Sequence, residues 1–341
     1  MQKKIKKILV IGGSGYLGSV LVPYLLSKNY RVKVLDLMIY GNNLKSHKNL
    51  KIIRGDLRDI NIIKKVFTGM DAVIHLACIS NDPSFELNPK VGKSINFTSF
   101  EPIVYLAKKL NIKRFIYASS SSVYGVKKVK NVTEESSLKP LTDYSKYKAK
   151  CEKILNSYSD DNFLVTSVRS ATLCGFSMRQ RLDLIVNIFC NLAYNIRSIS
   201  VYGGSQLRPN IHIKDAARFY ELLLNAPFKV INKQAFNIGY KNYSVVEIAK
   251  KVAKIFGKDI VIKEFPTNDK RSYHISSAKV YRSLKFKCRY SINDAIVELK
   301  KSFENKLLRN TLKNPKFYNI SVMKNYKFKK IIFSSKSLRL I

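Results

Sequence analysis

The most constraining feature of the chain is an apolar run near its start that breaks into glycines. Residues 8–11 read as a buried parallel strand, residues 12–18 hold four glycines, and residues 19–26 have helical apolar spacing. A strand, a tight glycine turn and a helix form the setting of a dinucleotide fingerprint. The free N–H groups at the start of such a helix attract phosphate. The segment therefore predicts a dinucleotide-binding turn.

Each glycine in this turn has an expected role. Gly12 permits the sharp change of direction, Gly15 lets the backbone approach a diphosphate, and Gly18 lets the helix pack against the strand. Tyr16 and Leu17 lie between them and are predicted cofactor contacts. An ordinary glycine-rich turn is the alternative, and the next strand argues against it.

That strand, residues 30–36, ends in a carboxylate. Asp36 follows Gly12 by 36 − 12 = 24 positions. A carboxylate at the tip of the second strand accepts hydrogen bonds from both hydroxyls of an adenosine ribose and repels a 2′-phosphate. Asp36 therefore favours NAD over NADP, with a strand-ending turn aspartate as the alternative.

Length and composition are those of a globular protein of the size of an enzyme, not of a disordered chain. The 341 residues are 46% hydrophobic, which suffices for one large or two modest domains. The five cysteines include no C-x-x-C pair, and the four histidines have no H-x-x-x-H spacing. These patterns predict a reducing, cytoplasmic setting without a metal site. No apolar run is long enough to span a membrane.

The net charge of +39, from 62 basic and 23 acidic residues, is the most unusual number in the composition. Taken alone, it suggests contact with nucleic acid or an anionic membrane surface. The lysines are spread along the whole chain, which favours a general compositional bias. A basic surface still attracts anionic substrates, and nucleic-acid contact would be non-specific and salt-sensitive.

Strands alternate with helices through the first half of the chain, which predicts an α/β, Rossmann-type, doubly wound parallel sheet. Ligands of such sheets bind beyond the carboxyl ends of the strands. Asp36, Asp56, Ala77 and Ser120 all follow predicted strands, so we expect them on one rim.

The pattern loosens after about residue 174, which predicts a smaller C-terminal α/β substrate-binding lobe. The expected division is a Rossmann domain over 1–174 with 210–240 returning to it, a substrate-binding lobe over 175–209 and 241–308, and a basic tail over 309–341.

A tyrosine and a lysine are placed to support proton transfer. Tyr144 and Lys148 are four apart on a predicted helix, so they share a face. A nearby ammonium and a positive nicotinamide ring favour the phenolate, which can take a proton from a sugar hydroxyl as hydride leaves the same carbon. Lys148 can also hold the nicotinamide ribose, and Ser120 can bind the same hydroxyl.

Taken together, the motifs resemble those of an extended short-chain dehydrogenase/reductase of the NAD-dependent sugar-nucleotide epimerase/dehydratase family, related to UDP-glucose 4-epimerase. The resemblance runs from Lys7 to about Phe303. It rests on residues 12–18, 55–57, 75–77, Asn96, 119–125, Tyr144 with Lys148, 208–215 and 269–273.

The resemblance implies several further contacts. Asp56 and Leu57 would hold the adenine, and Ala77 would lie along the cofactor. Arg208 and Arg271 would clamp the substrate diphosphate, which suits the fork geometry of arginine. Substrate contacts are also expected from Asn96 and Asn187. A homodimer through two long helices (residues 95–110 and 144–157) is implied as well.

Two departures from the family bear on the reaction. In the 4,6-dehydratases an Asp-Glu pair follows the catalytic serine or threonine, whereas this chain has Ser121 and Ser122, which are poor acids and bases at neutral pH. Ser122 also replaces a cysteine of the reductase/3,5-epimerases. Residues 170–172 lack an asparagine that contacts the diphosphate in many relatives.

These observations predict an NAD-dependent epimerase, acting at C4 of a nucleotide-diphosphate sugar through a transient 4-keto intermediate. A 4-dehydrogenase or 4-ketoreductase is the alternative within the family. A non-catalytic Rossmann scaffold that binds RNA or a membrane surface is the alternative outside it.

Overall fold

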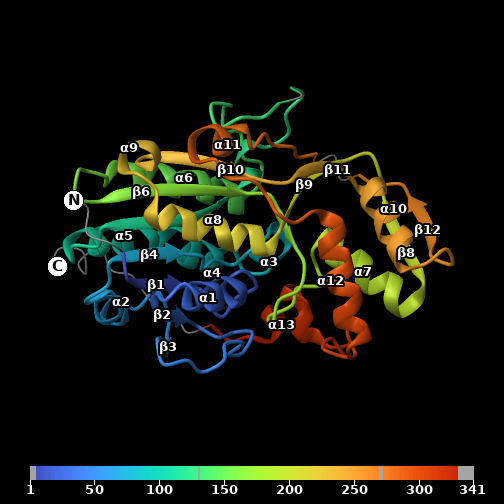
Figure 1. Ribbon diagram of the computed structural model, residues 1–341, viewed down its shortest axis with the longest axis horizontal. Helices are drawn as coiled ribbons and strands as arrows, with labels where there is room; N and C mark the ends of the chain where they lie inside the picture. Colours follow the sequence, from blue (N-terminus) through green and yellow to red (C-terminus); the bar gives the residue numbers. More distant parts are fainter. Residues whose placement is uncertain (1–4, 130, 269–271, 329–341) are drawn as a thin grey trace.

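A seven-stranded sheet organises the molecule. The computed structural model describes residues 5–129, 131–268 and 272–328. The strands of the sheet are β1 (Lys7–Ile11), β2 (Arg31–Asp36), β3 (Leu50–Arg54), β4 (Ala72–His75), β5 (Arg114–Ser120), β6 (Leu164–Ser170) and β10 (Gln234–Ile238). Their order is β10-β6-β5-β4-β1-β2-β3, and every neighbouring pair is parallel (Figure 1). The predicted doubly wound, Rossmann-type sheet is confirmed.

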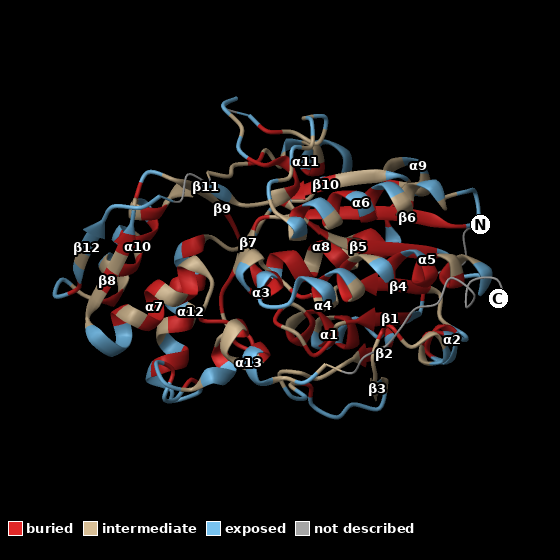
Figure 2. Cartoon of the chain, turned by 180° about the vertical axis from the view of Figure 1, so that it is seen from behind, coloured by how far each residue is buried: buried red, intermediate tan, exposed pale blue. Residues whose placement is uncertain are grey.

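Both faces of the sheet are covered by helices. One face packs against α1 (Gly18–Ser27) and α8 (Ile213–Asn225). The other face packs against α2 (Ile60–Phe67), α5 (Phe100–Lys109) and α6 (Asp143–Ser157). The central strands are therefore buried on both sides (Figure 2).

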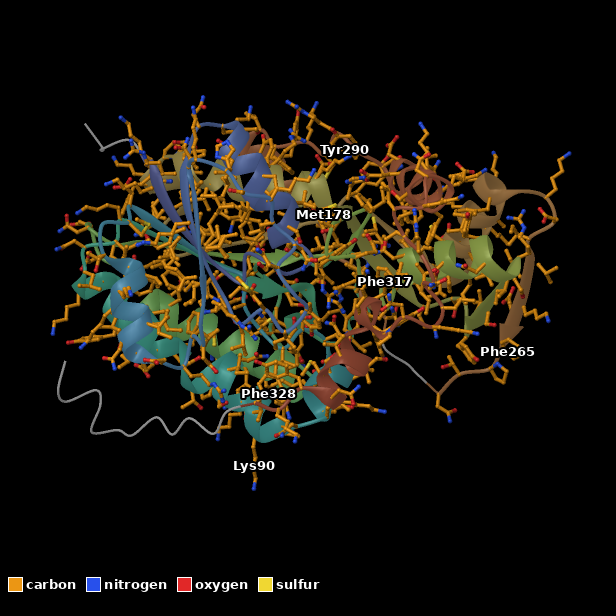
Figure 3. The ribbon with its side chains drawn as sticks, turned by 90° about the horizontal axis from the view of Figure 1, so that it is seen from below. Lys90, Met178, Phe265, Tyr290, Phe317 and Phe328 are labelled. Atoms are coloured by element: carbon orange, nitrogen blue, oxygen red, sulfur yellow. The ribbon has the colours of Figure 1, made fainter. Side chains whose placement is uncertain are left out.

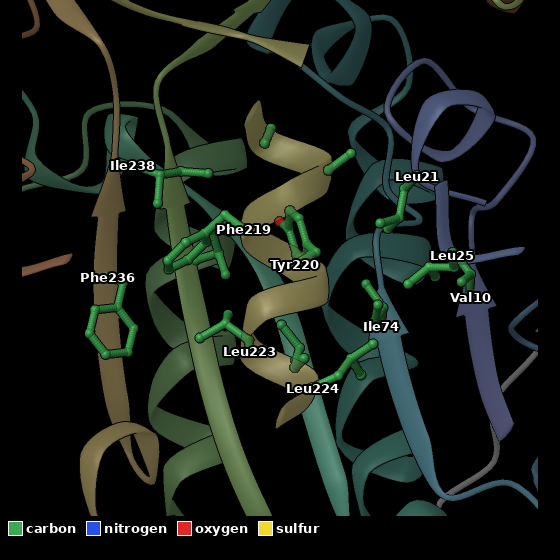
Figure 4. Packing of buried hydrophobic residues seen from close by; sticks show 14 of the residues in the cluster. Val10, Leu21, Leu25, Ile74, Phe219, Tyr220, Leu223, Leu224, Phe236 and Ile238 are labelled. Carbon is green, nitrogen blue, oxygen red and sulfur yellow. The ribbon is translucent and has the colours of Figure 1, made fainter. Parts of the chain in front are cut away.

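Alternation along each strand divides the side chains between two cores. Val10 belongs to the core beneath α1 and α8, whereas Leu9 and Ile11 belong to the core on the opposite face. In Figure 4, Phe219 and Leu223 of α8 lie over the strands of the first core. The alternation explains why the strands read as continuous apolar runs in the sequence.

The chain leaves the sheet after β6 and forms a second, smaller α/β lobe with its own core. Its elements are β7 (Thr172–Cys174), α7 (Ile185–Ile196), β8 (Ser198–Tyr202), β9 (Leu207–His212), β11 (Lys241–Ser244), α10 (Val245–Phe256), β12 (Val261–Phe265) and α12 (Ile292–Glu304). Strands β7, β9 and β11 form one small sheet, and β8 and β12 form another. Between these elements, α8 and β10 return to the large sheet.

Short helical turns complete the architecture. They are α3 (Asp82–Glu86), α4 (Pro89–Lys93), a π-helical turn (Ser94–Thr98), a 3₁₀ turn (Ser121–Tyr124), α9 (Phe228–Ile231) and α11 (Ala278–Leu284). The π-helical turn precedes α5, where one long helix was expected over residues 95–110. Among the helices of the described ranges, none combines the length and apolarity needed to cross a bilayer.

The described part of the expected tail is folded against both lobes. It contains a 3₁₀ turn (Pro315–Phe317) and α13 (Asn319–Asn325). Phe317 is buried in the core of the second lobe, whereas Met323 is buried in a core of the sheet domain. Figure 3 shows Phe317 and Phe328, which lie before and after α13 in the chain. It therefore bridges the two lobes; residues 329–341 lie outside the described ranges.

Candidate active site

A cavity of about 540 Å³ lies beyond the carboxyl ends of the strands, between the sheet and the second lobe. It includes the crevice between β1 and β4, where the strand order reverses and doubly wound folds bind ligands. Thirteen residues predicted from the sequence line it: Gly12, Gly15, Tyr16, Leu17, Gly18, Asp36, Asp56, Leu57, Ala77, Ser120, Tyr144, Lys148 and Arg208.

The glycine turn forms one wall of the cavity. Gly12 has a φ of +88°, and a Cβ there would lie 2.6 Å from the backbone nitrogen of Ala77. A Cβ on Gly15, by contrast, would meet only the carbonyl oxygen of Gly12, at 3.3 Å. Helix α1 begins at Gly18 and directs its N-terminus at this wall. The bare backbone and the helix end suit a diphosphate, so the site fits NAD.

Asp36 is oriented by backbone donors on either side of it. Its two carboxylate oxygens accept hydrogen bonds from the N–H of Ser14 (2.9 Å) and the N–H of Met38 (2.7 Å). Burial raises the pKa of Asp36, while these two bonds and the positive charge of Arg179 lower it. The carboxylate is thereby held in the cavity wall, where ribose hydroxyls would reach it.

The loop after β3 supplies a further part of the wall. Both carboxylate oxygens of Asp56 accept hydrogen bonds from Arg58, Oδ1 from Nε at 3.0 Å and Oδ2 from Nη2 at 2.7 Å. Leu57, which follows Asp56, is buried and lines the cavity. The predicted adenine contacts are therefore side by side in this wall.

Ser120, Tyr144 and Lys148 are brought together by β5 and α6. Helix α6 begins with a reciprocal capping box between Thr142 and Ser145. Lys148 Nζ donates a 2.6 Å hydrogen bond to the carbonyl oxygen of Ala118 and lies 5.8 Å from the centre of the Tyr144 ring. The hydroxyl of Ser120 shares a 2.9 Å hydrogen bond with Ser122 Oγ, and it is close enough to Tyr144 to lower the pKa of the phenol. The three side chains predicted to be catalytic therefore share one corner of the cavity.

The surroundings of Tyr144 keep its hydroxyl protonated. Burial raises its pKa well above the usual value, and the nearby Cys78 and Asp82 raise it further. Arg181 and the hydrogen bond with Ser120 act in the opposite direction. Proton removal therefore needs additional positive charge beside the phenol when the reaction occurs.

Two residues predicted to contact the substrate do not line the cavity. Their side chains instead make hydrogen bonds within its wall. The Asn96 amide pairs with the backbone of Ile79, accepting at 2.8 Å and donating at 2.9 Å. The Asn187 amide donates to the Tyr16 hydroxyl (2.9 Å) and to the carbonyl oxygen of Arg181 (2.8 Å). Both asparagines thus position segments that face the cavity.

The two predicted diphosphate clamps differ in what the structure shows of them. Arg208 lines the cavity, and its guanidinium lies 5.7 Å from the centre of the Tyr273 ring. Arg271 lies outside the described residues.

Sequence reasoning missed a cluster of polar residues on the second-lobe side of the cavity. It comprises Arg179, Arg181 and Asp183, together with Asn319 from α13. Arg181 forms a two-point pair with Asp183, at 2.9 and 3.1 Å. The only signal for this cluster in the sequence is the pair of arginines two positions apart, and nothing there connects them with Asn319.

The family described as the NAD dependent epimerase/dehydratase family matches residues 8–239. UDP-glucose 4-epimerase of Lactobacillus helveticus is 28% identical over 272 residues, covering 73% of this chain and 82% of the relative. dTDP-D-glucose 4,6-dehydratase of Dictyostelium discoideum is 28% identical over 275 residues, covering 74% of this chain and 62% of the relative.

A similar fold is found among solved structures. UDP-N-acetylglucosamine 4-epimerase from Methanobrevibacter ruminantium, in complex with UDP-N-acetylmuramic acid, matches with a TM-score of 0.80 and 26% identity over 89% of this chain and 100% of that one. The family match spans more than half of the chain and confirms the resemblance drawn from the motifs. The chain belongs to the NAD-dependent epimerase/dehydratase family, and NAD is its cofactor.

Proposed function

We propose that the protein is a nucleotide-sugar epimerase that inverts C4 through a transient 4-keto sugar. The observation that carries this proposal is the grouping of Ser120, Tyr144 and Lys148 in one corner of the cavity. The serines at positions 121 and 122 support it, because they stand where the family's dehydratases have an acid and a base.

The reaction is a reversible exchange of a proton and a hydride at one carbon. When bound, NAD would serve as hydride acceptor and then as hydride donor for C4. Acting as the phenolate, Tyr144 would take the proton of the C4 hydroxyl as the C–H bond breaks, and the resulting phenol would give it back to the ketone oxygen after the sugar has turned. Ser120 holds that oxygen by a hydrogen bond in both directions.

Lys148 has two roles in this account. Its ammonium is anchored on Ala118 at 2.6 Å, so its charge stays close to the Tyr144 ring. That charge favours the phenolate when the proton moves. The remaining N–H groups of the ammonium can hold a ribose hydroxyl of the cofactor.

The substrate class is supported by both charge and relatives. Arg208 in the cavity wall suits a diphosphate, and Arg271 is proposed as its second clamp. The relatives named UDP-glucose 4-epimerase and UDP-N-acetylglucosamine 4-epimerase act on nucleotide sugars according to their names. We extend to this chain the substrate class of a nucleotide-diphosphate hexose, a homodimer through α5 and α6, and a cytoplasmic location.

The test is to incubate purified protein with UDP-, GDP- and dTDP-hexoses and to separate the products by chromatography with mass detection. We expect interconversion of C4 epimers without net NADH formation, and its loss in Tyr144→Phe. Accumulation of a keto sugar with NADH would indicate the dehydrogenase alternative, and a product lighter by one water would indicate a dehydratase. A retarded RNA band at physiological salt, without turnover, would support the scaffold alternative.

A further inference from the structure

Arg179 is a buried cation in the cavity wall, and among the described residues no carboxylate forms a direct ion pair with it. Its side chain is 3% exposed, and its Nε has no hydrogen-bond partner among the described residues. One Nη donates to Asn319 Oδ1 and the other makes a long 3.4 Å contact with the carbonyl oxygen of Gln180. These partners are neutral. Arg181, two residues on, is instead paired with Asp183.

An unpaired guanidinium is costly to bury, because the charge has lost its hydration and gained no anion in return. Burial and the neighbouring Arg181 lower the pKa of Arg179 to about 10, although the negative charge of Asp183 acts in the opposite direction, so the group remains charged at neutral pH. The side chain is held in place nonetheless, with its guanidinium 3.8 Å from the centre of the Tyr40 ring. A fixed, buried cation that lines a cavity and has an unpartnered Nε among the described residues is suited to bind an anion.

The position of Arg179 indicates which anion. The segment that carries it is tied to the glycine turn, because Ser177 Oγ donates to the carbonyl oxygen of Tyr16 (2.9 Å) and the Tyr16 hydroxyl donates to that of Gly175 (2.7 Å). Arg179 also lowers the pKa of Asp36, so its charge reaches the expected ribose site. It therefore lies on the cofactor side of the cavity, near the start of α1.

We propose that Arg179 binds a phosphate oxygen of the cofactor diphosphate, opposite the glycine turn, and that Asn319 is a positioning residue for its guanidinium. The second lobe and the C-terminal segment then hold the cofactor together with the sheet domain. This inference rests on NAD binding and does not depend on the epimerase reaction.

The hydrogen bonds of Asn319 show how the C-terminal segment takes part. Its Oδ1 accepts from Arg179, while its Nδ2 donates to Ser80 Oγ at 3.0 Å in the loop after β4. Asn319 is buried at the start of α13, whose Met323 packs in a core of the sheet domain. Cofactor retention is thereby linked to a segment about 140 residues away in the sequence from Arg179.

The test compares ligands that do and do not carry a diphosphate. Isothermal titration of cofactor-stripped protein with ADP-ribose, adenosine and UDP separates the two sources of phosphate. For Arg179→Gln we expect ADP-ribose affinity to fall roughly 10- to 100-fold, the range of one charge-assisted hydrogen bond, with adenosine affinity unchanged. Arg179→Lys should restore part of the loss. Arg197→Gln, which removes an exposed pair with Asp259, is the matched control and should change neither.

A second variant tests the charge directly. In Asn319→Asp the new carboxylate would form an ion pair with the Arg179 guanidinium and compete with the diphosphate. The affinity for ADP-ribose should therefore fall, while the affinity for adenosine should stay the same. The proposal is overturned if Arg179→Gln weakens UDP and leaves ADP-ribose unchanged, because the guanidinium then serves the substrate. It is also overturned if ADP-ribose and adenosine weaken in parallel, or if neither changes. Each measurement remains informative when the protein shows no epimerase activity.

Discussion

Glu152 and Arg169 form a buried two-point ion pair that ties the helix carrying Tyr144 and Lys148 to strand β6. Arg169 Nη2 lies 2.7 Å from Glu152 Oε2, and Arg169 Nε lies 3.1 Å from Glu152 Oε1. Ser119 on β5 donates to the same carboxylate, and Arg169 donates to the Tyr124 hydroxyl at 2.8 Å. The helix that carries Tyr144 and Lys148 is thus held on the strand ends by charge as well as by packing.

Replacing Glu152 with Gln is expected to destabilise the fold by about 3 kcal/mol, because it leaves the Arg169 guanidinium buried without its counter-ion. Urea denaturation measures this. Lys146→Gln is the control on the same helix, since it removes only an exposed pair with Asp143 and should cost under about 1 kcal/mol. Equal losses in the two variants would contradict the structural role of the pair.

Tyr144→Phe is expected to lower kcat by about 10²- to 10⁴-fold, because the variant loses the group that exchanges the proton. Bound NAD, measured after denaturation of the purified protein, should stay at the wild-type level. Tyr147→Phe is the matched control: Tyr147 lies three positions along the helix and stacks on Phe97 at 4.9 Å. A Tyr144→Phe variant that turns over at the rate of Tyr147→Phe would refute the assignment.

Two glycine substitutions should separate folding from cofactor binding. Gly12→Ala places a Cβ against the Ala77 backbone at a φ of +88° and should cost about 1–3 kcal/mol of stability. The methyl group of Gly15→Ala would meet one backbone atom, the carbonyl oxygen of Gly12 at 3.3 Å, so this variant should lose less stability than Gly12→Ala, while its methyl group would face the diphosphate. We therefore expect weakened NAD binding in a folded Gly15→Ala protein, by titration. Unchanged affinity there would place the cofactor elsewhere.

His75 should make stability depend on pH. Burial, with Lys148 adding to it, lowers the pKa of His75 to about 3, below its ordinary 6.5. Between these values the unfolded chain binds the proton and the folded one does not, so stability is full above pH 6.5 and declines as the pH falls towards 3.

Below the ordinary pKa of 6.5, the free energy of unfolding should fall by about 1.4 kcal/mol per pH unit. It should therefore be about 2 kcal/mol lower at about pH 5 than at about pH 7.5. Urea denaturation gives the free energy of unfolding at each of these two pH values. The change between them should be smaller in His75→Leu than in the wild type by about 2 kcal/mol. A variant with the same pH dependence as the wild type would show that the pKa of His75 is not lowered by folding.

Much of the site was predictable because it follows from local patterns. Strand periodicity and turn residues place Asp36, Asp56 and Ala77 at carboxyl ends of parallel strands, and parallel strands bring those ends to one rim. The spacing of Tyr144 and Lys148 places them on one helix face without any knowledge of the rest of the fold. The sequence by itself therefore determined the sheet, the rim and the residues expected to be catalytic.

The tertiary structure alone decided which polar groups face the cavity and what charge they meet there. The side-chain amides of Asn96 and Asn187 are hydrogen-bonded within the wall. Asn319, from the distant C-terminal segment, accepts a hydrogen bond from Arg179. Burial also raises the pKa of Tyr144, which sequence spacing did not predict. Desolvation and hydrogen-bond partners arise from contacts between segments far apart in the chain, and local periodicity carries no information about them.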